Sequence, residues 1–379
     1  MKSPTAFLVA FVSLLAALPQ RGTAADPIDV RLQNRIALDG GGWLVQQREE
    51  SWDPAQTAVI VCDMWDAHHC LNAVRRGTEI APRVDALLRD LRGRGAMVVH
   101  SPSSCMAPYE DTPARKRAQA APKAANLPEG IGSWLHWIDE REEKAGYPID
   151  HSDGGEDDDP AEHAAWAKKL EAMGRNPGSP WKAQMAAIGI DQERDAISDS
   201  GEEIWNLLEQ RGAKNILLVG VHTNMCVLGR PFGLRQMAKN GKNVALVRDL
   251  TDTMYNPERP PQVSHFHGTD LVIEHIEKYV CPTLTSDQIL GGRPMKFRGD
   301  ARKDLVLIMA EQEYHTDKSV PAFAEAELRP HFRLHYVFAA DGDPNRLPGM
   351  EALRWADAAF ISVRRRTPPE DQLAALREF

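Results

Sequence analysis

The segment Ala58-Val59-Ile60-Val61-Cys62-Asp63 consists of five consecutive apolar residues followed by a carboxylate. An apolar run of this length is typical of a strand that is buried on both faces, as in a parallel sheet covered by helices. Further strand-like runs occur at 96–100, 195–197, 216–219 and 244–247, and stretches with helical character lie at 80–92, 202–210, 226–239 and 269–279. The alternation predicts a doubly wound α/β domain, a parallel sheet with helices on both faces.

The length of the chain predicts more than one folded unit. It has 379 residues, of which 42% are hydrophobic and 26% charged, whereas a single core rarely grows beyond about 250–300 residues. Gly291-Gly292-Arg293-Pro294 marks a change of composition, so we place one domain at 26–290, a linker at 291–303 and a second unit at 304–379. In this second, incomplete α/β unit we expect strands at 305–310, 333–338 and 358–363 and helices at 320–328 and 369–379.

A long insertion at 101–194 interrupts the first domain. It contains the acidic run 151–159, whose sequence is His-Ser-Asp-Gly-Gly-Glu-Asp-Asp-Asp. Its carboxylates suit a hard cation, but their spacing is not that of a helix–loop–helix calcium motif. We therefore expect a solvated loop.

The first 25 residues have the composition of a secretory signal peptide. Lys2 precedes the apolar stretch 6–17, and the small residues 23–25 precede Asp26. The alternative is a buried N-terminal helix. The signal-peptide interpretation predicts a secreted or periplasmic protein whose mature form has no membrane segment.

Charge and cysteine content limit the partners and the redox chemistry. The formal net charge is −9, and the basic residues form only short runs, such as Arg364-Arg365-Arg366, which are too short for a nucleic-acid surface. We expect a small-molecule substrate and allow for a homo-oligomer. The five cysteines, at 62, 70, 105, 226 and 281, cannot all pair with one another, so at least one thiol is free.

Two chemically reactive residues follow strands of the predicted sheet. Asp63 comes directly after the first strand, and Cys226 lies a few residues beyond the strand 216–219. Ligands of open parallel sheets bind at the carboxyl ends of strands. A cysteine at the start of a helix has a favoured thiolate, because backbone N–H groups and the helix dipole stabilise the negative charge. Cys226 is therefore a candidate nucleophile, and neighbouring N–H groups are candidates to stabilise an oxyanion.

Gly220 to Cys226, together with the strand ending at Asp63, resembles the isochorismatase-like cysteine hydrolases, which include nicotinamidases and N-carbamoyl amidohydrolases. The resemblance covers roughly residues 57–286. It implies that Asp63 is the base, that Cys226 is the nucleophile and that the Val221–His222 peptide bond is cis. The side chains of His222, Thr223, Asn224 and Trp65 are expected near the substrate.

The chain departs from this family at the position of the catalytic lysine. The family places the lysine after the third strand, where this chain reads Ser198-Asp199-Ser200-Gly201. Asp199 stands at this third position, and we expect a lysine or arginine of the insertion, such as Lys116 or Lys182, to supply the positive charge. Without a cation, Asp63 and a thiolate would repel each other.

A bound metal is not expected. Some family members hold zinc through an Asp-x-His arrangement after the second strand, but this chain reads His100-Ser101-Pro102-Ser103 there. Asp66, His68 and His69 are the alternative ligands. We predict no metal and no cofactor.

Two functions remain open from the sequence. The first is a secreted hydrolase that uses Cys226 on a small amide, carbamoyl or related substrate. The alternative is a non-catalytic protein that binds a small molecule or a partner and has lost the family lysine. The second unit, at 305–316 and 361–366, resembles the opening half of a trehalose-utilisation-type domain, related in fold to glutamine amidotransferases, which implies sugar-related binding or an interaction.

Overall fold

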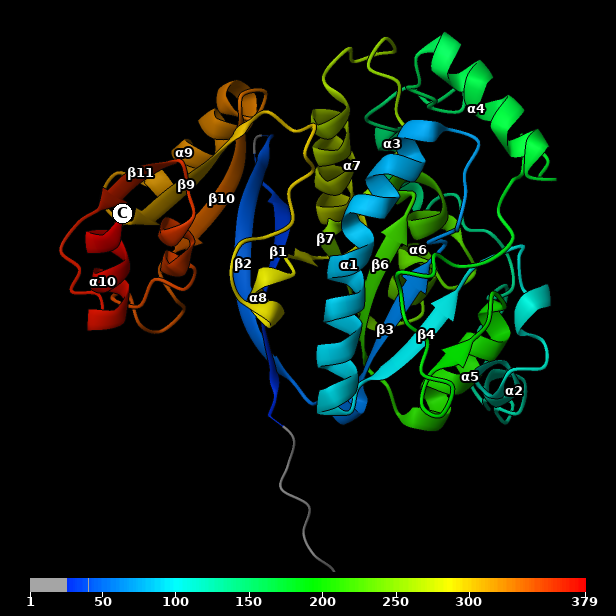
Figure 1. Cartoon of the computed structure of the whole chain (residues 1–379). Coiled ribbons are helices and arrows are strands. Elements are labelled where there is room, and N and C mark those ends of the chain that lie inside the picture. Colours follow the sequence, from blue (N-terminus) through cyan, green and yellow to red (C-terminus); the bar gives the residue numbers. More distant parts are fainter. Residues whose placement is uncertain (1–25, 40) are drawn as a thin grey trace, which may run out of the picture.

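The computed structural model describes residues 26–39 and 41–379. The predicted signal peptide at 1–25 lies outside the described residues. The larger sheet has eight strands in the order β2-β1-β8-β7-β6-β3-β4-β5 (Figure 1). Its strands are β1 (Ile28–Ala37), β2 (Trp43–Trp52), β3 (Thr57–Cys62), β4 (Met97–Ser101), β5 (Ala196–Ile197), β6 (Asn215–Val221), β7 (Asn243–Asp252) and β8 (Thr283–Leu284).

The predicted α/β class is confirmed, with one addition. Strands β3 to β8 pair in parallel, but β1 pairs antiparallel with both β2 and β8. The β1–β2 hairpin was not predicted, because its residues are only partly buried and mostly polar. It extends the parallel sheet at the edge that faces the second unit (Figure 1).

Residues of β3 alternate between two apolar layers, which explains why the whole strand is apolar. Ala58, Ile60 and Cys62 pack on one side of the sheet, whereas Val59 and Val61 pack on the other. Helices α1 (Leu71–Arg94) and α8 (Asp287–Leu290) cover the second side, and α5 (Gly201–Arg211), α6 (Leu234–Lys239) and α7 (His265–Tyr279) cover the first. The strand therefore meets a buried layer at every position.

The helix predicted over 226–239 is not continuous. The chain forms a π turn, η3 (Thr223–Val227), and α6 begins only at Leu234. Between them lies Pro231-Phe232-Gly233. Proline lacks a backbone N–H and disfavours a helical conformation in the residue before it, so the segment cannot continue as one helix.

The insertion lies against the first domain. It contributes α2 (Pro113–Gln119), α3 (Glu140–Ala145) and α4 (Pro160–Ala172). The Asp158 carboxylate accepts the backbone N–H groups of Leu71 and Asn72, each at 2.7 Å, at the N-terminus of α1. The expectation of a solvated acidic loop is therefore wrong at Asp157 and Asp158, whose carboxylates are buried against helix N–H groups and a guanidinium.

The second unit is a three-stranded parallel sheet in the order β10-β9-β11. The hairpin of the first sheet packs against it: Val45 of β2 belongs to its apolar core, and Arg35 of β1 lies 2.7 Å from Glu325. Its elements are β9 (Lys303–Ala310), α9 (Thr316–Phe323), the π turn η4 (Ala324–Leu328), β10 (Phe332–Phe338), the 3₁₀ turn η5 (Met350–Arg354), β11 (Ala358–Val363) and α10 (Glu370–Glu378).

Across the described residues, no helix combines the length and the apolar character needed to cross a bilayer.

Candidate active site

Asp63 is held in an uncommon backbone conformation immediately after β3. Its φ is +46°, a region that residues other than glycine rarely adopt. The Asp63 N–H donates to the carbonyl of Ser101 (3.1 Å), and its own carbonyl accepts the N–H of Trp65 (2.8 Å). The side chain is completely buried. Strained conformations of this kind persist where the surroundings enforce them, and they occur frequently at functional sites.

Cys226 follows β6 through a tight connection. The Val221–His222 peptide bond is cis, as the resemblance implies. Before it, Gly220 has a φ of +110°, and a Cβ at this position would collide with the backbone of Cys62. The π turn η3 then places Cys226 beside the end of β3, with 8% of the residue exposed.

Two backbone N–H groups next to Cys226 are already in use. The carbonyl of His222 accepts the N–H of Met225 (3.0 Å) and the N–H of Val227 (3.2 Å). Neither N–H group is free to bind an oxyanion. The expectation that N–H groups next to Cys226 stabilise an oxyanion is therefore wrong for these two donors.

The Asp63 carboxyl brings the site together. Its Oδ1 accepts the Ser103 N–H at 2.8 Å, and its Oδ2 lies 3.0 Å from Nε of Arg230. The same carboxyl acts on the neighbouring Cys226 thiol, whose pKa is raised by burial and by this negative charge. Because β3 and β6 are neighbours in the sheet, the ends of both strands reach this point. The sequence prediction that Asp63 and Cys226 converge agrees with this arrangement.

The positive charge comes from a residue that the sequence reading missed. Arg230 stands four positions after Cys226, and its backbone N–H donates to the Cys226 carbonyl at 3.0 Å. The expectation of a cation from the insertion is wrong for the two lysines named: Lys116 Nζ lies 3.7 Å from Asp111, and Lys182 Nζ donates to the carbonyl of Gly174. The (i, i+4) spacing from the nucleophile was the available signal.

Asp199 does not act as the third member of the cluster. Its carboxylate accepts the N–H of Ser104 at 3.1 Å. Ser103, the residue before Ser104, donates its backbone N–H to the Asp63 carboxylate. The turn after β4 therefore holds both aspartates through consecutive N–H groups, and Arg230 contacts Asp63 directly.

The protonation of the cluster differs from the sequence expectation. Burial raises the pKa of Asp63, although Arg230 opposes this effect. Burial also raises the pKa of the Cys226 thiol well above its usual range, and the negative charge of Asp63 adds to the increase. The prediction of a lowered Cys226 pKa is therefore wrong for this structure, because the thiol is desolvated and lies in a π turn beside a carboxylate.

An aromatic group stands next to the cluster. The Trp65 indole donates to the carbonyl of Ser103 (3.0 Å) and stacks on Trp181, with 4.6 Å between ring centroids. The rings of His68 and His222 lie 4.8 Å apart. Trp65 and His222 thus lie near Asp63 and Cys226 as packed aromatic side chains.

Thr223 and Asn224 hold the turn rather than presenting free polar groups. The hydroxyl of Thr223 is 2.7 Å from that of Thr251. The Asn224 amide donates to the Met254 carbonyl (2.8 Å) and accepts the Met254 N–H (3.0 Å). Both side chains tie η3 to the end of β7, so their role in this structure is positional.

The insertion covers Arg230. The guanidinium of Arg230 lies 5.6 Å from the centre of the Trp134 ring, and the Leu135 N–H donates to the Gly229 carbonyl at 2.9 Å. A Cβ on Gly229 would collide with the Trp134 indole. The Arg230 side chain is 23% exposed, whereas that of Asp63 is not exposed, so the cation forms the open end of the cluster.

A second buried ionic cluster lies near the end of β7. Arg76 of α1 contacts Asp252 (2.8 Å) and Asp157 (2.7 Å), and His265 of α7 contacts the same two carboxylates at 2.9 and 3.2 Å. The adjacent negative charges outweigh burial and raise the pKa of His265 to about 9. The cations lower the pKa of Asp252 to about 2. This arrangement satisfies its charges internally.

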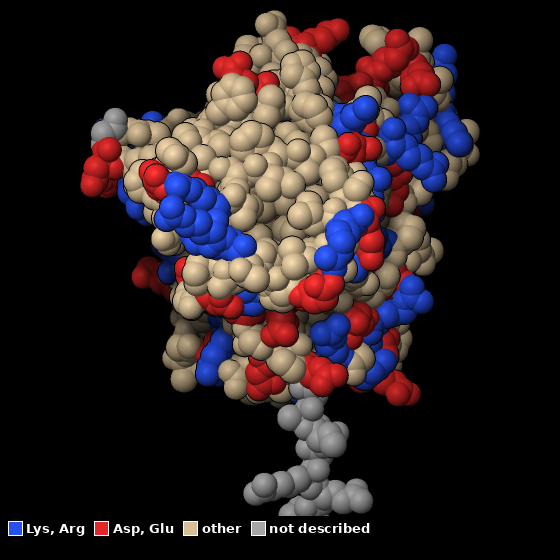
Figure 2. All heavy atoms as spheres, turned by 90° about the vertical axis from the view of Figure 1, so that its left-hand side faces the viewer, with Lys and Arg blue, Asp and Glu red and all other residues tan. Residues whose placement is uncertain are grey.

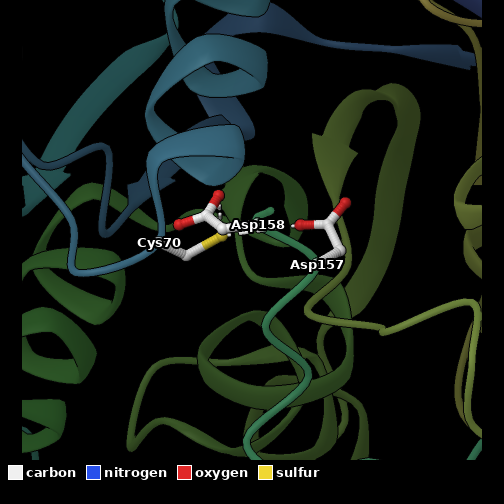
Figure 3. Close-up of side chains that lie close together, drawn as sticks. All are labelled: Cys70, Asp157 and Asp158. Carbon is white, nitrogen blue, oxygen red and sulfur yellow. Dashed lines mark hydrogen bonds between the residues drawn. The ribbon is translucent and has the colours of Figure 1, made fainter. Parts of the chain in front are cut away.

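Cys70, Asp157 and Asp158 bring possible metal-ligand atoms within 4.8 Å of one another (Figure 3). Each group has a partner already: Asp157 binds Arg76, Asp158 caps α1, and the Cys70 sulfur accepts the Ala73 N–H at 3.4 Å. The cluster is accounted for as the junction of the acidic loop with α1.

Of the zinc ligands considered from the sequence, the rings of His68 and His69 lie 4.0 Å apart, but each of the three side chains has its own partner. Asp66 pairs with Arg175 at 2.8 Å, whereas the His69 imidazole lies 3.2 Å from Glu156. His68 accepts the Cys70 N–H through Nδ1. These contacts direct the three side chains to different partners.

No protein-family model and no curated protein matches the sequence. Solved structures that are similar to this chain over about 60% of its length include isochorismatase-family cysteine hydrolases. A cysteine hydrolase from Pseudomonas syringae pv. phaseolicola 1448A is 16% identical, with a TM-score of 0.36, and the match covers 62% of this chain and 92% of that one.

An isochorismatase family protein from Desulfovibrio vulgaris is 15% identical (TM-score 0.30; 58% of this chain and 89% of that one). The nicotinamidase PncA from Bacillus subtilis is 13% identical (TM-score 0.29; 60% and 99%). Similarity at this level does not define a substrate, so function has to be argued from the site itself.

Proposed function

We propose that the chain is a hydrolase that attacks a small amide, carbamoyl or related carbonyl substrate with the Cys226 thiol. The observation that supports this proposal is that one buried carboxyl, that of Asp63, pairs with the Arg230 guanidinium at 3.0 Å and also acts electrostatically on the Cys226 thiol. A nucleophile, a base and an orienting charge within one cluster are the usual components of covalent catalysis. Arg230 takes the place of the family lysine.

In the first half of the reaction, the Cys226 sulfur forms a bond to the substrate carbonyl carbon while Asp63 accepts the thiol proton. Asp63 has to be ionised to accept this proton, and Arg230 favours that form, whereas burial raises the pKa of Asp63 and so makes its carboxylate a stronger base toward the thiol. The C–N bond then breaks, and the proton passes from Asp63 to the leaving nitrogen. Arg230 stabilises the ionised form of Asp63, which is present before the thiol proton is taken and after the proton has passed to the leaving nitrogen.

In the second half, water attacks the thioester. Asp63 takes one proton from the water as the new C–O bond forms, and it returns this proton to sulfur as the C–S bond breaks. The products are a carboxylic or carbamic acid and the free thiol. Asp63 thus acts as base and then as acid, as general acid–base catalysis requires.

Mass spectrometry of the protein during turnover of a panel of small amides and carbamoyl compounds tests the proposal. The expected result is an acyl adduct on the peptide that contains Cys226. Cys105→Ala is the matched control, because Cys105 is also buried and near Asp63; this variant should form the adduct at an unchanged rate. The absence of both turnover and adduct would contradict the hydrolase and favour the non-catalytic binding protein.

Export and the sugar-related role of the second unit are further parts of the proposal. The composition of residues 1–25 supports a cleaved leader. N-terminal sequencing of exported protein is expected to begin near Asp26, and a mature chain that starts at Met1 would contradict it. Binding of disaccharides by the full chain, measured by calorimetry, tests the role of the second unit.

A further inference from the structure

Two cavities lie at the junction between the first domain and the second unit. Their volumes are about 80 and 60 Å³, and both are lined by Arg248 of β7 and Arg333 of β10. Each has room for several water molecules or for one small ion, because a water molecule needs about 10–15 Å³ of such space. The junction is therefore hollow where arginines from two different sheets face the same space.

Arg248 stands on an irregular stretch of β7. Strand β6 advances by only two residues between its pairings with Leu246 and Thr251, so residues 247–250 of β7 correspond to a single residue of β6. Extra residues of this kind form a bulge, which turns side chains away from the regular alternation of a strand. The bulge allows Arg248 to leave the apolar layers of the sheet and to line both cavities.

The Arg248 guanidinium lacks a counter-charge. Its Nη1 donates to the Thr283 hydroxyl at 3.0 Å, and no Asp or Glu oxygen among residues 26–39 and 41–379 lies within 4.0 Å of its nitrogen atoms. Burial lowers the pKa of Arg248, whereas the pKa of every other described arginine that departs from its usual value is raised. A cation held away from water without a partner is unfavourable.

Arg333 adds positive charge at the same place. Its Nη1 lies 3.3 Å from the Asp304 carboxylate, which also pairs with Arg293 and lies 3.9 Å from Nζ of Lys296. Burial and the charges of Arg333 and Arg248 lower the pKa of His335 to about 4, so this imidazole is neutral at pH 7 although it contacts Asp304 at 2.8 Å. One carboxylate therefore serves three cations.

The acidic side chains that line the cavities are engaged elsewhere. Four of them pair with cations: Glu277 with Arg35, Glu274 with Lys278, and both Asp270 and Asp300 with Arg302. The fifth, Asp249, accepts the Ser286 N–H at 2.8 Å, the Ser286 hydroxyl at 2.6 Å and the Met295 N–H at 2.8 Å. These carboxylates are satisfied without Arg248, which remains the lining cation without a counter-ion in the part of the chain that the structure describes.

The position of Arg248 differs from that of charged residues on the surface. Figure 2 shows the outer face of the second unit, where side chains of both signs stand around an uncharged centre. Water screens charges at such a surface, so they do not need a fixed counter-ion. Arg248 is partly buried, and an anion that binds at the junction gains more from each charge because screening is weaker there.

We propose that the junction binds a small oxyanion, a phosphate or carboxylate group, through the guanidinium of Arg248 and the positive charge of Arg333. A guanidinium forms two parallel N–H···O bonds with either group. The ligand supplies the counter-charge that Arg248 lacks and connects β7 of the first domain with β10 of the second unit, so its binding stabilises the folded chain. The site is separate from the candidate active site, since Asp63, Cys226 and Arg230 line neither cavity.

Calorimetric titration of the full chain with inorganic phosphate tests the site, with chloride holding the ionic strength constant. Arg248→Gln should weaken phosphate binding by about tenfold or more, and Arg248→Lys should weaken it less, since it keeps the charge but not the guanidinium geometry. Arg89→Gln is the matched control, because Arg89 of α1 is exposed and pairs with Asp85; it should bind as the wild type does. Acetate is titrated in parallel, and the tighter ligand shows whether phosphate or carboxylate is preferred.

Thermal unfolding separates binding from a structural role of Arg248. Phosphate should raise the unfolding temperature of the wild-type chain but not that of Arg248→Gln. Without phosphate, Arg248→Gln should be at least as stable as the wild type, because it removes a desolvated cation that has no counter-charge. Arg230→Gln distinguishes the junction from the active site and should still bind phosphate.

Three binding results would overturn the proposal: no binding of either anion at up to about 10 mM, phosphate binding that Arg248→Gln leaves unchanged, or binding that is lost in Arg230→Gln instead. An Arg248→Gln chain that unfolds well below the wild type in the absence of phosphate would also contradict it, because the guanidinium would then serve the fold rather than a ligand.

Discussion

Two buried ionic clusters lie at the carboxyl ends of neighbouring strands, and their charges are balanced differently. In the cluster of Arg76, His265, Asp157 and Asp252, two cations face two carboxylates, and the pKa of both aspartates falls. In the cluster of Asp63, Cys226 and Arg230, one cation serves a carboxyl and a thiol, and the pKa of Asp63 rises. A fully compensated cluster stabilises the fold, whereas an under-compensated one keeps a group ready to exchange a proton.

Replacing the nucleophile should give the largest effect. Cys226→Ala is expected to lower turnover by about 10⁴-fold or more, because the covalent step needs the sulfur. Steady-state rates with the best substrate of the amide panel measure this loss. Cys281→Ala removes a thiol of equal exposure and should leave the rate unchanged. Equal loss in both variants would show that the effect comes from packing.

Mutation of the charge-balanced cluster around Arg76 should lower the stability of the fold. Arg76→Met leaves Asp157 and Asp252 buried without their guanidinium, so we expect a loss of about 3–5 kcal/mol in the free energy of unfolding. Urea denaturation measures it. Arg75→Met is the matched control, since Arg75 is half-exposed and pairs with the exposed Glu162; its loss should stay below about 1 kcal/mol. Similar losses in the two variants would contradict the distinction.

The same cluster predicts a pH dependence. The pKa of His265 is raised from 6.5 to about 9 in the folded protein. The ionised imidazole therefore stabilises the fold fully below pH 6.5, and this contribution is lost as the pH rises through about 9. We expect a decrease of up to about 3 kcal/mol in the free energy of unfolding over this window. His265→Gln should flatten the decrease, and an unchanged slope would count against the assignment.

Substitution of Arg230, the cation of the cluster that contains Asp63 and Cys226, should reduce activity least when the positive charge is kept. Arg230→Gln is expected to lower the turnover number by about a hundredfold, because Asp63 loses its only direct ion-pair contact seen in the described residues. Arg230→Lys should retain activity within about tenfold, since it keeps the charge but not the fixed guanidinium geometry. Rates across pH measure both variants. If glutamine performed as well as lysine, charge would not be the contribution of this residue.

The sequence was sufficient to predict the site residues that directly follow strands of the parallel sheet. Asp63 and Cys226 each follow an apolar run, and parallel strands place their carboxyl ends together. Arg230 was missed because the cation was expected from the insertion, although Arg230 stands one helical turn after Cys226 and its N–H bonds the Cys226 carbonyl. The burial of Asp157 was missed for a related reason: a run of acidic residues does not reveal that a distant arginine and a helix N-terminus will compensate it.

The contact of Trp134 with Gly229 has a consequence for the history of the protein. The indole occupies the volume where any side chain at position 229 would begin, and the neighbouring Arg230 extends over the same ring. The insertion and the turn after the nucleophile are therefore expected to vary as a pair among relatives. A lineage that shortens the insertion releases position 229 from glycine, and one that keeps the tryptophan also retains the glycine.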